Sequence, residues 1–144
     1  MAGIVVGVDG SPNSERALDW AMRHAAALHV PLTVVAVHEV AKSYWGHIPV
    51  IGPPDQPVLD SLHQAAEEMT QKAAGRLGDA APAVTVRAVS GFVVKELVDA
   101  SQDADMVVLG ARGGSGFARL LMGSVSNEVV QHSACAVVIV PHAG

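Results

Sequence analysis

The residues best suited to chemistry lie in a glycine-rich stretch, GARGGSGFARLLMG followed by SVSNEVV, at residues 110–130. Glycines at this density let a backbone adopt positive φ and approach a ligand closely, and successive N–H groups in such a backbone bind anions. Gly123-Ser124 then begins a predicted helix, whose first N–H groups lack partners within the helix and lie at the positive end of its dipole. Arg112 and Arg119 make the stretch locally positive in a chain of net charge -5. This combination favours a phosphate site over a merely flexible loop followed by an ordinary helix cap.

The stretch differs from two common phosphate-binding motifs. A P-loop has Lys before its Ser or Thr, whereas Gly123 precedes Ser124 here. A dinucleotide fingerprint would follow the first strand, where the sequence instead reads GVDGSPNS and places Asp9 where a pyrophosphate would approach. The sequence therefore predicts a phosphate site of another kind.

Short apolar runs and amphipathic segments alternate along the chain and must position this site. The runs predict strands at residues 3–8, 32–37, 83–89, 105–109 and 136–140. The segments between them predict helices at residues 12–30, 58–77, 92–102 and 124–133. Such an alternation is typical of an α/β fold with an open parallel sheet and helices on both faces. The stretch 43–57, with its prolines and glycines, is predicted to be a long loop without a regular element.

Composition limits the class of protein. Half of the residues are apolar, 16% are charged and 3% are aromatic, which predicts one globular domain over residues 1–144 with a core of small aliphatic side chains. The net charge of -5 argues against broad contact with nucleic acid. Cys135 is the only cysteine, no apolar run is long enough to cross a membrane, and the first residues do not resemble a signal peptide. We therefore expect a soluble, cytoplasmic protein.

The glycine-rich stretch also resembles a specific family. Its spacing, Gly110-x-x-Gly113, nine residues, then Gly123-Ser124, matches the ATP-binding signature of the universal stress protein family. The opening IVVGVDGS and the closing SVSNEVVQHSACAVVIVP are similar to that family as well, so the resemblance covers nearly the whole chain. It implies a Rossmann-like fold of the adenine nucleotide alpha hydrolase type, with five strands in the order 3-2-1-4-5. The implied ligand is ATP, with or without Mg²⁺, in the crevice where the first and fourth strands end.

The resemblance also implies roles for individual positions. Asp9 would contact the adenosine moiety, because a carboxylate accepts hydrogen bonds from ribose hydroxyls or an adenine amine and repels phosphate. The end of the second strand would contact adenine through Val37 and Glu39. Glu39 departs from the family's apolar residue, and either accepts from the adenine amine or turns outward. The expected nucleotide contacts are Gly7, Val8, Asp9, Val37, Glu39, Leu109, Gly110, Arg112, Gly113, Gly123, Ser124, Val125 and Ser126.

Three classes of function stay open at this point. They are a nucleotide-binding regulatory module of the stress response, a slow ATP hydrolase or autophosphorylating protein, and an interaction module without nucleotide. A phosphate site without evident catalytic equipment favours the first, which is not an enzyme.

Three further features bear on partners. The apolar segment Ala136–Val140 is expected at a sheet edge, and both the open edge and the resemblance imply a homodimer joined there. Cys135 is expected to pack beside this strand rather than to act in redox chemistry. Tyr44 and Trp45 either cover apolar surface, which is the favoured interpretation, or cover the nucleotide or contact a partner.

Overall fold

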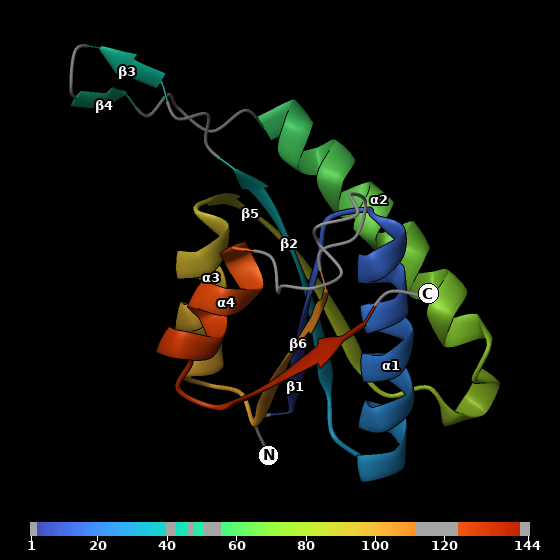
Figure 1. Ribbon diagram of the computed structural model, residues 1–144. Helices are drawn as coiled ribbons and strands as arrows, with labels where there is room; N and C mark the ends of the chain where they lie inside the picture. The colour runs from blue at the N-terminus through green and yellow to red at the C-terminus, as the bar shows by residue number, and fades with distance from the viewer. Residues whose placement is uncertain (1–2, 40–42, 46–47, 51–55, 112–123, 142–144) are drawn as a thin grey trace.

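A computed structural model of the chain describes residues 3–39, 43–45, 48–50, 56–111 and 124–141. At Glu39 and in residues 43–45 and 48–50 the description is confined to the backbone. The elements in chain order are β1 Ile4–Val8, α1 Pro12–Leu28, β2 Leu32–Glu39, β3 Ser43–Trp45, β4 Ile48–Val50, α2 Gln56–Gly75, the 3-10 turn η1 Gly78–Ala80, β5 Val84–Gly91, α3 Val93–Ser101, β6 Met106–Gly110, α4 Ser124–His132 and β7 Ala136–Val140 (Figure 1).

The main sheet has five parallel strands in the order β5-β2-β1-β6-β7. Counted along this sheet alone, the order is 3-2-1-4-5, so the predicted topology is confirmed. β1 lies at the centre, where Val6 pairs with Val34 of β2 and with Val108 of β6. The strands that were expected to carry the site, β1 and β6, are therefore neighbours.

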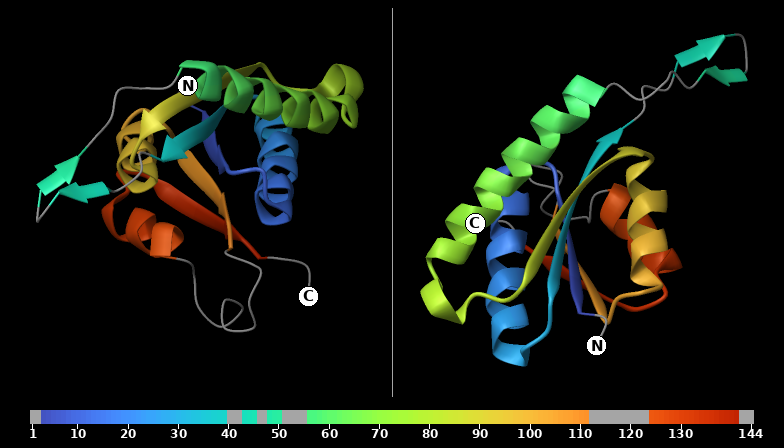
Figure 2. Two further views of the ribbon diagram at one scale, coloured as in Figure 1. Left: turned by 90° about the horizontal axis from the view of Figure 1, so that it is seen from above. Right: turned by 180° about the vertical axis from the view of Figure 1, so that it is seen from behind.

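Helices cover both faces of this sheet (Figures 1 and 2). On one face, Ile4, Val6 and Val8 of β1 pack in a core cluster with residues of α1 and α2. On the other face, Val5 packs with residues of α3 and α4. Both faces are buried at the centre of the sheet, which explains why β1 and β6 are apolar along their whole length, whereas the edge strand β5 alternates apolar and polar residues at its start.

The start of α1 follows from local sequence. Gly10 adopts a φ of 84°, which favours glycine, and turns the chain out of β1. Ser11 is the N-cap, and its side chain accepts a hydrogen bond from the Ser14 N–H, while Pro12 takes the first helical position. The helix therefore begins directly behind the end of β1, at the edge of the sheet where ligands bind in this class of fold.

The prediction of a loop at residues 43–57 is wrong in two places. β3 and β4 pair as an antiparallel hairpin with Tyr44 opposite Pro49, and α2 already begins at Gln56. The aromatic and β-branched residues of the two strands favour pairing, and Pro49 is tolerated because each strand of a two-stranded hairpin has a free edge. In Figure 1 the hairpin projects from the body of the molecule beyond the end of β2. Separately, none of the helices in the described ranges has the length and apolar character needed to cross a membrane.

Candidate functional site

A cavity of about 690 Å³ opens where β1 and β6 end. This is the topological switch point, because α1 packs on one face of the sheet and α4 on the other. The volume lies within the range of about 300–1,000 Å³ that small-molecule sites occupy. Its lining residues are Gly7, Val8, Asp9, Ser11, Asn13, Ser14, Val35, Val37, Val93, Leu97, Leu109, Gly110, Ala111, Ser124, Val125 and Ser126.

One part of the cavity is apolar. Val35 and Val37 of β2, Leu97 of α3 and Leu109 of β6 meet around Gly7. A Cβ at Gly7 would lie 3.0 Å from Leu109 Cδ2 and 3.1 Å from Leu97 Cδ2, closer than side chains normally approach. Gly7 thus lets the Leu97 and Leu109 side chains pack closely against β1, where they form part of the apolar lining.

The polar part begins at the turn between β1 and α1. Asp9 is exposed, and its Oδ1 accepts a hydrogen bond from the Ser11 N–H at 2.9 Å. Partial burial raises the pKa of Asp9, but hydrogen bonds from Ser11 and Ser14 together outweigh it and hold the net pKa below the ordinary value of 3.8. Near neutral pH, Asp9 is therefore an oriented, ionised acceptor at the rim of the cavity.

The start of α4 supplies the other polar wall. Ser124 is exposed, whereas Ser126 is 5% exposed and its Oγ lies 3.5 Å from the Gly110 carbonyl oxygen. The first N–H groups of α4 have no acceptor within their own helix and carry the positive end of its dipole. This wall is suited to an anion, while Asp9 is suited to hydroxyl or amine donors.

Gly110 allows β6 and α1 to approach each other. A Cβ at this position would lie 2.5 Å from the backbone oxygen of Asn13, which no side chain could tolerate without a shift of the backbone. The glycine was predicted to serve a close ligand approach. The structure adds a packing reason for it, because the end of β6 presses against the first turn of α1 there.

Most of the predicted site residues surround this one cavity. The structure brings together Gly7, Val8, Asp9, Val37, Leu109, Gly110, Ser124, Val125 and Ser126. Arg112, Gly113, Gly123 and the side chain of Glu39 lie outside the described residues. Sequence reasoning missed Ser11, Asn13, Ser14, Val35, Val93, Leu97 and Ala111. Ser11 and Ser14 could have been found, since the cap and first turn of a helix after β1 must lie at the same edge as Asp9.

The described residues contain no group of three or more His, Cys, Asp or Glu side chains placed to hold a metal ion. Asp9 is the one carboxylate among the described residues that line the cavity.

An α/β domain with a cavity at the switch point defines a Rossmann-like ligand-binding class. Within this class, the chain belongs to the universal stress protein family, which its sequence matches over residues 2–141. Universal stress protein Rv2623 of Mycobacterium tuberculosis is 34% identical over 143 residues, covering 96% of this chain and 47% of that protein. The chain thus spans about half the length of the curated relatives it matches.

Solved structures share the fold. The universal stress protein UspA of Lactobacillus plantarum shares the fold with a TM-score of 0.73 at 22% identity, covering 96% of this chain and 97% of that one. A universal stress protein crystallised in complex with cAMP has a TM-score of 0.67 and 29% identity, covering 98% of this chain and 97% of that one. The family and fold predicted from sequence are therefore confirmed.

Proposed function

We propose that this chain binds an adenine nucleotide, ATP by preference, in the cavity at the ends of β1 and β6. The observation that carries this proposal is the division of the cavity into an apolar recess and a wall made by the start of α4. A nucleotide has the same division, with a flat base at one end and phosphates at the other. The complex of a related universal stress protein with cAMP supports the adenine nucleotide class.

The adenosine end would lie between Asp9 and the apolar recess. The carboxylate of Asp9 is held by the Ser11 N–H, so it can accept from a ribose hydroxyl or the adenine amine with little loss of side-chain freedom. The same negative charge repels phosphate. Asp9 would therefore fix the direction in which the nucleotide lies, with its base against the apolar part of the lining and its phosphates toward α4.

The phosphate end would lie at Ser124, Val125 and Ser126, joined by Arg112, Gly113 and Gly123 of the signature, which fall outside the described residues. Free N–H groups at a helix start and serine hydroxyls stabilise each added phosphate oxygen. ATP should bind more tightly than AMP for this reason. Mg²⁺ would be held by the phosphates and water.

We further propose a regulatory role in the stress response rather than efficient turnover. Fast phosphoryl transfer needs metal ligands and a group that positions the attacking nucleophile, and Asp9 is the single described candidate for either task. Multiple-turnover phosphate release with and without Mg²⁺ tests this. Release of many equivalents of phosphate per protein within minutes would make the chain an ATP hydrolase instead.

The proposed assembly is a cytoplasmic homodimer. β7 forms one edge of the main sheet, and Val137, Val138 and Ile139 are only half-buried in the single chain. An apolar edge strand of this kind is readily paired by a second copy. The single cysteine suits a reducing compartment. Sedimentation at micromolar concentration should give a dimer, and a monomer there would contradict this part of the proposal.

The nucleotide itself is tested by mass spectrometry of whatever leaves the purified protein on denaturation, followed by titration of the folded protein with ATP, AMP, cAMP and GTP. We expect an adenine nucleotide to be released in the first experiment. In the second we expect the protein to bind ATP more tightly than AMP. If no adenine nucleotide is released and none binds at millimolar concentration, the chain is an interaction module without nucleotide.

Asp9→Ala tests the orientation of the ligand. Losing a hydrogen bond to a charged group should weaken nucleotide binding by about 1–3 kcal/mol. Because the contact is to the adenosine end, affinity for ATP and for AMP should fall by the same factor. A loss confined to ATP, measured by calorimetric titration, would place Asp9 at the phosphates and reverse the proposed direction.

A further inference from the structure

The cavity has a polar side chain that the nucleotide contacts proposed above do not include. Asn13 lies in the first turn of α1, is half-buried and lines the cavity. Its side-chain amide makes no hydrogen bond with another described residue, whereas the neighbouring Ser11 and Ser14 are hydrogen-bonded to each other. Its N–H is one of those that a helix leaves without an internal acceptor. Asn13 therefore presents free donors to whatever occupies the cavity.

The order of the strands places Asn13 along the cavity. The apolar side chains of Val35 and Val37 belong to β2, and Asp9 follows the neighbouring strand β1. Gly110 ends β6, which lies on the other side of β1. Asn13 lies beside this glycine, since its Cβ is 3.2 Å from the position that a Cβ at Gly110 would occupy. A nucleotide with its base at β2 and its ribose at Asp9 would therefore bring its phosphates past Asn13.

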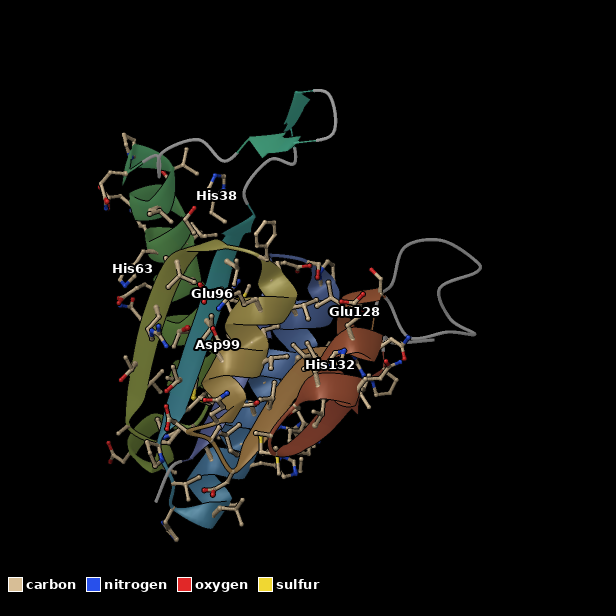
Figure 3. The ribbon with its side chains drawn as sticks, turned by 90° about the vertical axis from the view of Figure 1, so that its left-hand side faces the viewer. His38, His63, Glu96, Asp99, Glu128 and His132 are labelled. Atoms are coloured by element: carbon tan, nitrogen blue, oxygen red, sulfur yellow. The ribbon has the colours of Figure 1, made fainter. Side chains whose placement is uncertain are left out.

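Two helix starts meet the end of β6 from opposite faces of the sheet. In Figure 3, α3 and α4 lie in front of the sheet and α1 lies behind it. From the α4 side, the Ser126 Oγ lies 3.5 Å from the Gly110 carbonyl oxygen. From the α1 side, the Asn13 Cβ and backbone oxygen lie against the same glycine. Phosphates at this point would have the start of α4 on one side and Asn13 on the other.

The charges around the cavity agree with this placement. Asp9 is the one described carboxylate that lines the cavity, and Glu96 and Glu128, both labelled in Figure 3, do not line it. The first turns of both α1 and α4 line the cavity, so the positive ends of two helix dipoles meet there. A side-chain amide in this place donates to phosphate oxygens, and a hydrogen bond to a charged acceptor is stronger than one between neutral groups.

We propose that Asn13 is a specificity-determining residue, which makes the cavity prefer ATP over AMP by donating hydrogen bonds to the phosphates beyond the first. This inference rests on the proposed nucleotide function and adds to it a contact from α1. The other role open to Asn13 is to stabilise the start of α1 alone. An aspartate in the first turn of a helix is stabilising because of the helix dipole, whereas an aspartate beside phosphates repels them. Binding and stability therefore separate the two roles.

The test measures the ATP and AMP affinities of the full chain by calorimetric titration in the parent and in two variants. Asn13→Ala should weaken ATP binding about tenfold and AMP binding less than about twofold. Asn13→Asp should weaken ATP binding about a hundredfold, because it replaces a donor with a negative charge. The urea midpoint of Asn13→Asp should stay at or above that of the parent chain, which shows that the loss of binding is not a loss of folding.

The chain offers a matched control in its other asparagine. Asn127 is exposed near the start of α4 and does not line the cavity. Asn127→Asp therefore introduces the same charge close to the same site without facing the ligand. In about 0.15 M salt, where exposed charges are screened, this variant should weaken ATP binding by no more than about threefold.

Three results would overturn this inference and leave the proposed function in place. The first is an equal loss of ATP and AMP affinity in Asn13→Ala, which would place Asn13 at the adenosine end or at the first phosphate. The second is unchanged ATP affinity in both Asn13 variants of a parent chain that binds ATP. The third is a loss in Asn127→Asp as large as that in Asn13→Asp. If the parent chain binds no nucleotide, the proposed function and this inference fail together.

Discussion

Asp9 connects the rim of the cavity to the first turn of α1, since its carboxylate accepts a hydrogen bond from the Ser11 N–H. Burial raises the pKa of Asp9. The hydrogen bonds from Ser11 and Ser14 together lower the pKa by more than burial raises it, so the folded-state pKa lies below 3.8. The native carboxyl thus binds a proton less well than the unfolded one. Asp9 therefore stabilises the fold fully above about pH 3.8, and this contribution is lost as pH falls through the lower folded-state pKa.

Asp9→Asn keeps an oxygen that accepts from Ser11 but removes the titration. We expect the free energy of unfolding of the parent chain, relative to Asp9→Asn, to be constant above about pH 4 and to decline below it. Urea titrations of both proteins between about pH 7 and pH 2.5 measure this difference. A difference that stays constant over the whole range would mean that the carboxylate gains nothing from its partners in the folded state.

Gly123 tests the phosphate end at the scale of one residue. Gly123→Glu adds a side chain and a negative charge next to Ser124, where the signature expects phosphate, so ATP affinity should fall at least a hundredfold, or about 2.7 kcal/mol. Gly75→Glu is the matched control, because a side chain at Gly75 meets no atom within 4 Å and the residue lies at the end of α2. Calorimetric titration of both variants decides. Unchanged ATP affinity in a folded Gly123→Glu protein would reject the proposed geometry.

Among the elements, α1 ends on a residue that its conformation does not favour. His29 is exposed and adopts a φ of 56°, and its N–H donates to the last turn of the helix. Glycine takes this left-handed conformation without a steric penalty, although it gains freedom in the unfolded chain. His29→Gly should therefore raise the free energy of unfolding by about 0.5–1 kcal/mol.

The same substitution in the interior of a helix should have the opposite sign. Ala65 is exposed on α2, and Ala65→Gly should lower the free energy of unfolding by about 0.5–1 kcal/mol. Denaturant unfolding of the two variants compares them directly. If both glycines destabilise the protein, the conformation at His29 carries no strain that glycine could relieve.

The elements also show how far sequence patterns reach. A strand that is buried on both faces must be apolar throughout. The apolar run Ile4–Val8, followed by the helix cap Ser11, therefore predicted a central strand. The hairpin of β3 and β4 was missed because the prolines and glycines around it outweighed the aromatic and β-branched residues within it. Strands of three residues are too short to show an alternating pattern, so the sequence alone does not indicate that Tyr44 pairs with Pro49.

The site was predictable where it follows from chain order. Asp9 directly follows β1, Gly110 ends β6 and Ser124 begins α4, so a parallel sheet places them at one edge. Val35 and Leu97 line the same cavity but lie in the middle of their elements. They reach it only through the register of β2 against β1 and the packing of α3 on the sheet, which the sequence does not encode locally. The strand order itself came from the family resemblance.

At the scale of the whole molecule, the cavity lies next to the proposed dimer edge. Ala111 lines the cavity, and its N–H donates to the Val140 carbonyl oxygen at the end of β7, at 2.8 Å. A nucleotide bound in the cavity would restrict the motion of this end of β7. An edge strand ordered in advance pairs with a smaller loss of entropy, so ATP should strengthen dimerisation.

This coupling has a quantitative signature. If each site binds ATP about fivefold more tightly in the dimer, a typical lower value for coupled sites, saturating ATP must raise the dimerisation constant about 25-fold, because a dimer holds two sites. Sedimentation over a range of protein concentrations, with and without saturating ATP, measures this factor. A dimerisation constant that ATP leaves unchanged would mean that the cavity and the edge act independently, and that any signal from the nucleotide leaves the molecule by another surface.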